Sequence, residues 1–494
     1  MRARDQLRIL LLAAGLCGCA ADLSAPPPMD CGQMRASFSM RATPKLDVLF
    51  MVDNSNGIEL LAMELRDRFP RLAAGFERLA QAGVPLDAHF GVVTSDYGAG
   101  ATGSLSCSRS PGGQRGRLQG IGVKALQNCK KPVGANFVRY VFDAGGAGPN
   151  NLPAAQTLTE TIQCMASGGD GGCAFEHSLE SVYAALMNDI PENAGFLRDD
   201  AVLAVFLITD EDDASAPADT DLFDVEKTPE YGYLDSYSRQ TRFGVLCCPP
   251  GRVNCTSDEL TFPPYDDSLG PLAGCIPAPN DPTGTGPGKL FDVRRYMQLK
   301  PDRNDIILMG VIGPTAPFQV MLSVPWSVFG QPTCDRIRED SIPACVPVLQ
   351  HATCPSPRNP NFWPDPAVRL EAVIKSAPIH LIESACTSNF TNFLDSAAKL
   401  ISNRFLAPAC LPEKLKANAA VDCVVEESTT QKDGTTTVSS VPPCNGNPVK
   451  DVCYWLVKRD ECAGRSPDSL EIAIERAGLA PERSVVEVVC PRGC

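Results

Sequence analysis

Histidine is scarce in this chain of 494 residues, and the short-spaced motifs that hold zinc are missing. Only four histidines are present, and neither a His-Glu-x-x-His pattern nor a Cys-x-x-Cys pair occurs. Zinc sites use histidine and cysteine ligands at such spacings, and thioredoxin-like redox sites use Cys-x-x-Cys. The sequence therefore argues against zinc chemistry and against a redox-active cysteine pair.

Basic residues are also in short supply. Lys and Arg total 44 against 58 Asp and Glu, which gives a formal net charge of −14. An acidic chain without a basic patch is a poor partner for nucleic acid or for anionic lipid headgroups. Neither a Gly-x-Ser-x-Gly nucleophile motif nor a phosphate-binding Gly-x-x-x-x-Gly-Lys motif is present, so no familiar enzyme class is indicated.

The chain begins with a short apolar segment that does not reach the length of a membrane span. Ile9 to Leu16 is apolar and the stretch ends near Ala21, whereas a spanning helix needs about 20 apolar residues. Three arginines precede it within the first eight residues. This order predicts a secretion signal.

Leu16-Cys17-Gly18-Cys19 resembles a bacterial lipobox. The resemblance implies that residues 1–18 are a removable signal and that Cys19 carries the lipid anchor of an envelope protein. An ordinary secretion signal with incidental cysteines is the alternative. Ala20 and Ala21 place no acidic residue after Cys19, which by the same resemblance favours the outer membrane. Several acyl chains on one residue would give firm anchoring.

Cysteine, proline and glycine are abundant by contrast. The sequence has 22 Cys, 43 Pro and 40 Gly. So many cysteines indicate an oxidising compartment, and an even number remains after Cys17 and Cys19 are set aside, which predicts complete disulfide pairing. The proline and glycine content predicts long irregular loops that disulfides hold in place.

Apolar runs alternate with amphipathic stretches through the first four fifths of the chain. Runs that are apolar on both faces predict buried strands, and apolar residues at three- and four-residue steps predict helices. Alternation of the two predicts an α/β fold with a doubly wound, mainly parallel sheet. Pro70 lies inside the first helical stripe, so we expect a kink or two abutting helices there. The predicted strands are residues 46–52, 89–94, 201–209, 306–312 and 379–382, and the predicted helices include 58–79, 179–187 and 393–401.

The composition predicts three regions after the signal. These are a tether at 19–44, the α/β domain at 45–405, and a Cys-rich β module at 406–494. A short module of this kind buries too little apolar surface to fold without disulfides. Insertions are expected in the α/β domain at about 97–135, 214–288 and 315–364.

Two disulfide hypotheses follow from the cysteine positions. Cys107 and Cys129 both lie in the first insertion and are expected to pair with each other. The C-terminal module has an odd number of cysteines, from Cys410 to Cys494, so at least one is expected to pair outside it. Cys386 is the nearest upstream candidate.

Small oxygen-bearing residues follow two of the predicted strands. Asp53 and Ser55 follow the first strand, and Asp210 follows the most apolar one. Side chains at the carboxyl ends of parallel strands meet at one edge of a sheet, and oxygen ligands suit a hard divalent cation. The pattern resembles a von Willebrand factor type A (VWA) domain, whose metal-dependent adhesion site (MIDAS) begins with Asp-x-Ser-x-Ser and ends with an aspartate placed like Asp210.

The chain departs from the VWA pattern at two positions. Gly57 stands in place of the second serine of the motif, and Cys173 in Gly171-Gly172-Cys173 stands in place of a threonine. Cys173 is expected to be in a disulfide, with Cys164 as a candidate partner. Carboxylates at Asp96, Glu176 and Glu211 could compensate for the two missing hydroxyls.

Alternative roles remain for these residues at this point. Asp53, Ser55 and Asp210 could instead cap the helices that follow them through backbone N–H groups. We expect the acidic run Asp210 to Asp213 to be a solvated loop, and His177 to be a surface or partly buried helix residue.

The VWA resemblance implies a binding protein, not an enzyme. It implies Mg²⁺ or Mn²⁺ held by Asp53, Ser55 and Asp210, with one coordination position open for an acidic group of a protein or polysaccharide partner. The expected role is adhesion at the bacterial cell envelope, without nucleic acid and with membrane contact through the lipid only. Two rival hypotheses are a structural envelope protein with a vestigial metal site and a metal-assisted hydrolase that uses Asp53, Asp210 and Asp212.

Overall fold

The structure is a computed structural model, and most of the chain can be described from it. The described residues are 32–40, 44–55, 58–81, 84–98, 113–123, 125, 128–143, 145–169, 171–173, 175–224, 227, 238–263, 271–280, 288–299, 306–315, 317–323, 346–350, 364–387, 389–406, 409–416, 422–430, 435–445, 452–458, 462–463, 466–476 and 484–493. They form two compact units, one of residues 41–407 and one of residues 1–40 with 408–494.

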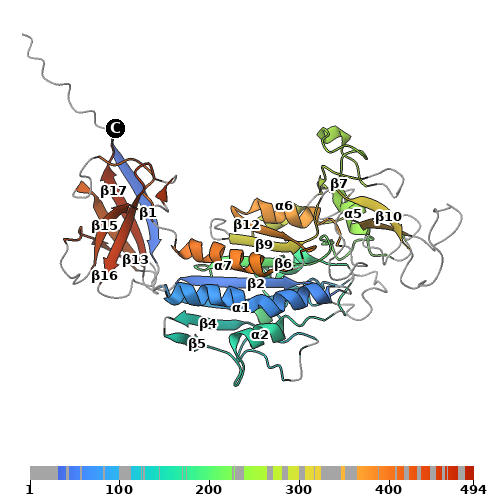
Figure 1. The fold of residues 1–494 in the computed structure, drawn as a ribbon, viewed down its shortest axis with the longest axis horizontal. Helices are drawn as coiled ribbons and strands as arrows, with labels where there is room; N and C mark the ends of the chain where they lie inside the picture. Colours follow the sequence, from blue (N-terminus) through green and yellow to red (C-terminus); the bar gives the residue numbers. More distant parts are fainter. Residues whose placement is uncertain are drawn as a thin grey trace, which may run out of the picture. The chain divides into compact units, whose positions relative to one another are not determined.

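A seven-stranded sheet is the centre of the unit 41–407 (Figure 1). Its strand order is β12-β9-β6-β2-β3-β4-β5. The strands from β12 to β3 run parallel, while β4 and β5 are antiparallel at one edge, so the sheet is mixed. The bounds are β2 Lys45–Val52, β3 Leu86–Thr94, β4 Val138–Asp143, β5 Gly146–Asn150, β6 Val202–Ile208, β9 Ile306–Ile312 and β12 Ile379–Ser384.

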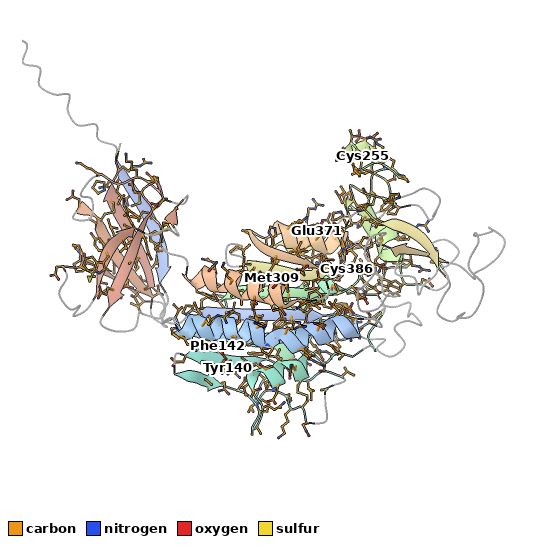
Figure 2. The ribbon with its side chains drawn as sticks, viewed as in Figure 1. Tyr140, Phe142, Cys255, Met309, Glu371 and Cys386 are labelled. Carbon is orange, nitrogen blue, oxygen red and sulfur yellow. A yellow bond between two sulfur atoms is a disulfide. The ribbon has the colours of Figure 1, made fainter. Side chains whose placement is uncertain are left out.

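Both faces of this sheet are apolar because successive strand residues point to opposite sides. Val48 and Phe50 of β2 belong to one buried cluster, whereas Leu49 and Met51 belong to another. Helices α1, α2 and α7 contribute to the first cluster, and α3 and α6 to the second. Figure 2 labels Phe142 on β4 and Met309 on β9, two side chains of the first cluster. The bounds are α1 Glu59–Gln81, α2 Leu158–Met165, α3 Ser178–Met187, α6 Val368–Ser376 and α7 Thr391–Leu406.

The longest helix confirms the apolar stripe predicted for it. Every stripe residue from Ile58 to Leu79 is buried. Pro70 lies inside one continuous helix, so the alternative of two abutting helices is wrong. Gly75 allows the closest approach to α7, because a Cβ there would lie 2.4 Å from the Cβ of Ala398.

A buried ion pair lies near the amino ends of the central strands. Asp47 of β2 is fully buried and accepts hydrogen bonds from the Arg198 backbone N–H at 2.7 Å and from its Nε at 2.8 Å. His89 of β3 is close to the same carboxylate, at 3.6 Å, and its Nδ1 lies 2.8 Å from the carbonyl oxygen of Phe196. Burial lowers the pKa of His89 to about 4, so its ring is neutral at pH 7, and Arg198 is the charged partner that the described contacts give Asp47.

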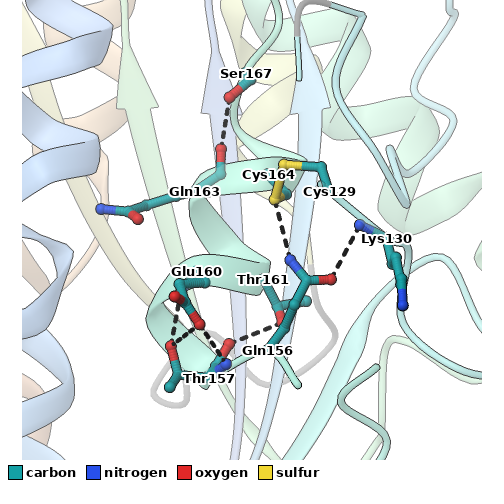
Figure 3. Close-up of a disulfide and its surroundings, with 9 residues drawn as sticks. All are labelled: Cys129, Lys130, Gln156, Thr157, Glu160, Thr161, Gln163, Cys164 and Ser167. Carbon is teal, nitrogen blue, oxygen red and sulfur yellow. Dashed lines mark hydrogen bonds between the residues drawn. A yellow bond between two sulfur atoms is a disulfide. The ribbon is translucent and has the colours of Figure 1, made fainter. Parts of the chain in front are cut away.

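The disulfide at Cys129 differs from the predicted pairing. Cys129 bonds to Cys164 of α2, over a Cα–Cα distance of 5.5 Å (Figure 3). The predicted Cys107–Cys129 and Cys164–Cys173 pairs are therefore wrong. Cys173 and Cys386 are both disulfide-bonded. The pairing of Cys386 with the C-terminal module stays a prediction, and Cys107 lies outside the described residues.

The unit of residues 1–40 with 408–494 is β-rich and discontinuous in sequence. Its main sheet has the order β1-β17-β13-β14, and β1 pairs antiparallel with β17. Residues 33–40 are thus a strand of this unit, which corrects the prediction that all of 19–44 is a tether. The bounds are β1 Gln33–Met40, β13 Val424–Thr430, β14 Thr436–Ser440, β15 Val452–Lys458, β16 Leu470–Arg476 and β17 Ser484–Pro491.

Among its described residues, three disulfides hold this unit internally. They join Cys410 to Cys462, Cys423 to Cys490, and Cys444 to Cys453. Cys410 is therefore not the cysteine that pairs outside the module.

No helix among the described residues is both long and apolar enough to cross a membrane.

The insertions of the larger unit contain short elements where the sequence predicts irregular loops. Disulfides Cys247–Cys275 and Cys248–Cys255 hold the second insertion. The bounds are α5 Ser238–Gly244, β7 Val245–Leu246, η4 Ser257–Glu259, β8 Ile276–Pro277, β10 Gln319–Ser323 and β11 Val346–Gln350. Two further short helices, η2 Pro191–Asn193 and η6 Val293–Met297, lie outside the insertions.

Candidate metal centre

Asp53 lies directly after β2, at the carboxyl edge of the parallel strands. Its backbone N–H donates to the carbonyl oxygen of Ile208 at 2.9 Å, which fixes it beside the end of β6. The Ser55 N–H and the Ser95 hydroxyl donate to its Oδ1 at 2.7 and 3.1 Å. The Thr209 hydroxyl donates to Oδ2 at 2.8 Å. The predicted helix-capping role is wrong for Asp53, because these donors belong to turns and strand ends and α1 begins only at Glu59.

Asp210 reaches the same edge from β6. Burial, and then the charge of Asp53, raise the pKa of Asp210 well above its usual value. Burial likewise raises the pKa of Asp53, although its hydrogen bonds with Ser55, Thr209 and Ser95 oppose the shift. Oδ1 of Asp210 has no hydrogen-bond partner among the described residues. The two aspartates predicted to meet therefore do meet, as a buried pair of carboxyl groups.

Ser55 and Glu176 face this pair with unused oxygen atoms. The Ser55 hydroxyl and both carboxyl oxygens of Glu176 are buried, and none has a hydrogen-bond partner among the described residues. Burial, followed by the charge of Asp53, raises the pKa of Glu176 well above its usual value. Glu176 lies just before α3, where Gly171-Gly172-Cys173 also approaches: the Gly172 N–H donates to the Asn54 carbonyl oxygen at 2.9 Å.

Two further carboxyl groups adjoin the pair from other segments. Glu211 follows Asp210, and burial and the charge of Glu176 raise its pKa well above the usual value. Asp365 lies before α6, and its N–H donates to the carbonyl oxygen of Asp210 at 2.7 Å. Burial also raises the pKa of Asp365. Both are buried, with 5% and 4% of their surface exposed.

These residues fit a hard divalent cation. Every side-chain atom here that could bind a cation is a carboxyl or hydroxyl oxygen, and Mg²⁺, Mn²⁺ and Ca²⁺ prefer such ligands. Buried oxygens without partners are costly unless a proton or a cation satisfies them. Within the described part of the chain, however, no three of these carboxylates bring one oxygen each within 4.8 Å of one another. The carboxylates therefore meet in pairs, and a cation would be completed by hydroxyl, amide or water oxygens.

Asp96 was predicted as a weaker ligand, and the structure gives it a different setting. Its Oδ1 accepts the Gly98 N–H at 3.1 Å, and its carbonyl oxygen accepts the N–H groups of Gln114 and Arg115. These contacts shape the turn after β3. Gly57 lies outside the described residues.

The acidic run after β6 is buried, not solvated as predicted. The backbone N–H groups of Arg369 and Leu370 donate to the Asp212 carboxylate at 3.1 Å, at the start of α6. Asp213 accepts the Leu179 N–H at 2.9 Å, at the start of α3, and its Oδ2 pairs with Arg369 at 3.0 Å. Burial raises the pKa of Asp212 to about 7 despite these partners. Both carboxylates therefore hold helix ends.

His177 is also more deeply buried than predicted. It precedes α3 and is only 3% exposed, and its ring stacks at 5.7 Å from that of Tyr97. Burial lowers its pKa to about 4, so the ring is neutral at pH 7.

Sequence reasoning missed three contributors to the site. Thr209 could have been found, because its hydroxyl directly precedes Asp210 in the same strand-end motif. Asp365 and Gln240 gave no such signal, since Gln240 lies within the second insertion and Asp365 directly follows the third. Gln240 of α5 donates from Nε2 to Oε2 of Glu211 at 3.5 Å and is fully buried.

No protein-family model and no curated protein matches the chain. Among solved structures, the pilus adhesin SpaC from Lactobacillus rhamnosus GG is similar at 9% identity and a TM-score of 0.28, over 93% of this chain and 41% of that one. A von Willebrand factor type A protein from Catenulispora acidiphila is similar at 9% identity and a TM-score of 0.23, over 94% of this chain and 62% of that one. The pilus adhesin RrgA from Streptococcus pneumoniae is similar at 9% identity and a TM-score of 0.26, over 95% of this chain and 60% of that one.

The chain thus spans between 41% and 62% of the length of these three structures. TM-scores this low carry no argument about fold or function, and the names belong to those proteins. The conclusions drawn below are based on the sheet edge itself.

Proposed function

We propose that residues 41–407 form a VWA-like domain that binds a divalent cation, Mg²⁺ or Mn²⁺, through Asp53, Ser55 and Asp210. One observation carries the proposal: two carboxylates from adjacent parallel strands converge with the unpartnered hydroxyl of Ser55 at one buried edge. A divalent cation would supply the positive charge that this edge lacks.

The strand order supports the placement of the cation. From β2 the sheet grows through β3 in one direction, whereas β6, β9 and β12 extend it in the other. Ligands of open α/β sheets bind at such reversals, outside the carboxyl ends of the strands. Asp53 and Asp210 follow the two strands, β2 and β6, that flank this point.

In the proposed function, the cation binds an acidic group of a protein or polysaccharide partner. Asp210 keeps 6% of its surface exposed and Glu211 keeps 5%, while Asp53 and Ser55 are almost fully enclosed. The side of Asp210 and Glu211 is therefore the route by which a partner's carboxylate would reach the cation. Binding of this kind uses charge and direction and needs no catalytic base.

The hydrolase hypothesis needs Asp212 as a metal ligand, but the Asp212 carboxylate is already used inside the fold. Asp212 already accepts the N–H groups of Arg369 and Leu370 at the start of α6. A vestigial site in a structural protein is the remaining rival, and the cation titration below separates it from the proposal.

The proposed place of action is the bacterial cell envelope, with Cys19 as a lipid anchor in the outer membrane. The support is the Leu16-Cys17-Gly18-Cys19 sequence and the disulfides, which require an oxidising compartment. Persistence of membrane association in Cys19→Ser would refute the anchor.

Calorimetric titration of the soluble chain starting at Ala20, with Mg²⁺ and Mn²⁺ separately, tests the cation site. Saturable binding is expected, and it should be lost in Asp53→Ala and in Asp210→Ala because each removes one carboxylate of the pair. Asp199→Ala is the matched control, since Asp199 is exposed. No binding by a folded wild-type chain would mean that the site is vestigial.

A further inference from the structure

A polar cleft in the unit 41–407 lies outside the proposed cation site. Its volume is about 410 Å³, and ligand sites in proteins usually measure about 300–1,000 Å³. Two segments line it: residues 131–139, which end in the first residues of β4, and residues 191–195, which contain η2. None of the lining residues contributes to the cation site, so a ligand bound here would occupy a separate place on the same domain.

The first lining segment is held in place by Asn151. Its Nδ2 donates to the carbonyl oxygens of Val133 and Phe137 at 3.2 and 3.0 Å. Its Oδ1 accepts the Arg139 N–H at 2.7 Å, and its carbonyl oxygen accepts the Val133 N–H at 2.9 Å. The loop from Val133 to Phe137 is therefore fixed at both ends.

The second lining segment is held by another asparagine. Asn193 is buried, donates from Nδ2 to the Gly116 carbonyl oxygen at 2.8 Å, and accepts the Leu118 N–H at Oδ1, also at 2.8 Å. The ring of Phe196, which follows this segment, packs edge-on against Phe137 at 5.6 Å. Both sides of the cleft are thus formed before any ligand arrives, which lowers the free-energy cost of binding.

The charges in the cleft are mainly positive. Lys131 and Arg139 are exposed, and their side chains make no ion pair or hydrogen bond within the described part of the chain. The Arg139 guanidinium lies 5.5 Å from the ring centroid of Phe137, which restrains it. Glu192 is the acidic residue of the lining. Two cations against one carboxylate favour an anionic ligand, although the chain as a whole has a net charge of −14.

Main-chain groups in the cleft are also unused. The N–H and carbonyl groups of Gly134, Asn136 and Gly195 make no hydrogen bond to other described residues. The main chain of a bound peptide supplies matching donors and acceptors, and main-chain hydrogen bonds give affinity in several modes of peptide recognition. A sugar ring has no open aromatic surface to lie against, because Phe137 is the aromatic residue of the lining and is only 2% exposed.

We propose that this cleft binds an acidic peptide segment of a protein partner, whose carboxylates pair with Lys131 and Arg139. Guanidinium and ammonium groups form strong, charge-assisted hydrogen bonds with carboxylates. The free main-chain groups of Gly134, Asn136 and Gly195 would bind the peptide backbone. This interaction needs no metal ion and is independent of the cation site.

Calorimetric titration of the soluble chain from Ala20 tests the proposal, with a blocked peptide of glutamate residues as the probe. EDTA is present throughout, so that no divalent cation contributes to binding. Saturable binding is expected, and Lys131→Ala and Arg139→Ala should each weaken it about tenfold. Lys130→Ala is the matched control, since Lys130 is the neighbouring exposed lysine and does not line the cleft.

Two further variants separate the cleft from general charge attraction. Glu192→Gln should tighten binding about twofold, because it removes a like charge from the cleft; a folding defect would not produce a gain. Asn151→Ala changes no charge but releases the loop from Val133 to Phe137, so it should weaken binding. Asp53→Ala should leave binding in EDTA unchanged, whatever it does to cation binding.

The opposite results would overturn the proposal. These are no binding of the glutamate peptide, equal binding by a blocked glutamine peptide of the same length, or an equal loss in Lys130→Ala and Lys131→Ala. Tighter binding of an oligogalacturonate with the same number of carboxylates would make the ligand a saccharide. Self-association of the chain that Lys131→Ala abolishes would make the occupant a second copy.

Discussion

The two ends of strand β2 treat a buried aspartate in opposite ways. Near the amino end, Asp47 is matched by the Arg198 guanidinium and backbone N–H, with His89 close by. At the carboxyl end, the side chains that hydrogen-bond to Asp53 are hydroxyls, and the charged groups that act on its partner Asp210 are carboxylates. The first arrangement is complete within the chain, whereas the second is a concentration of negative charge that calls for a ligand. A buried charge alone therefore does not identify a site; the identity of its partners does.

The largest loss of stability is expected when the ion pair of Asp47 with Arg198, near the amino end of β2, is removed. Arg198→Ala leaves Asp47 buried without its cation, which should lower the free energy of unfolding by about 3–5 kcal/mol. Urea denaturation measures this change. The control is Arg294→Ala, because Arg294 pairs with Asp292 while its side chain is 74% exposed, and its loss should cost less than about 1 kcal/mol. Equal losses in both variants would contradict the comparison.

A divalent cation should stabilise the fold by binding at the carboxyl end of β2, beside Asp53 and Asp210, and not at Asp47. At one hundred times its dissociation constant, a cation that binds the folded chain alone raises the free energy of unfolding by about 2.7 kcal/mol. Urea denaturation with and without Mg²⁺ measures this gain. The gain should persist in Arg198→Ala and vanish in Asp210→Asn. A gain that survives in Asp210→Asn would place the cation elsewhere.

The metal-free chain should also show a pH dependence of stability. Burial raises the pKa of Glu176, Asp210 and Glu211 above their usual values, so the folded state holds protons that the unfolded chain has lost. Their stabilising contribution is complete below the unfolded values near pH 4 and is lost as the pH rises through the raised values. For Asp212, that upper limit is about pH 7.

Urea denaturation between pH 4 and 8 checks this dependence. Each net proton changes stability by about 1.4 kcal/mol per pH unit. Saturating Mg²⁺ should flatten the curve, because the cation replaces protons at the carboxylates. A metal-free curve that rises with pH over this range would refute the assigned shifts.

The central strands and the meeting of Asp53 with Asp210 could be predicted from local sequence. The apolar runs set the strands, and parallel pairing brings their carboxyl ends together. The positions of Glu176 and Glu211 near the site could also be predicted, since Glu176 precedes a predicted helix and Glu211 follows a predicted strand.

Other features depend on contacts between distant segments. Asp212 and Asp213 read as a solvated loop because the helices that they cap, α6 and α3, are fixed only by the folded chain. Gln240 lies in an insertion with no repeating pattern, and Asp365 directly follows another one. The Cys129–Cys164 bond joins two segments 35 residues apart. Sequence spacing does not contain these pairings.

The pairing of β1 with β17 has a consequence for the order of folding. Residues 33–40 meet residues 484–491, so the larger unit is inserted between two strands of the smaller one. Strand β17 also lies between β1 and β13, so β1 cannot pair before the end of the chain is available, whereas β13 can already pair with β14. Closing so long an unfolded loop costs entropy that grows with its length, whereas prior folding of the inserted unit shortens the loop. Loop-closure entropy therefore favours folding of the inserted unit before β1 pairs with β17, and a chain that stops before β17 would leave its first strand without this partner.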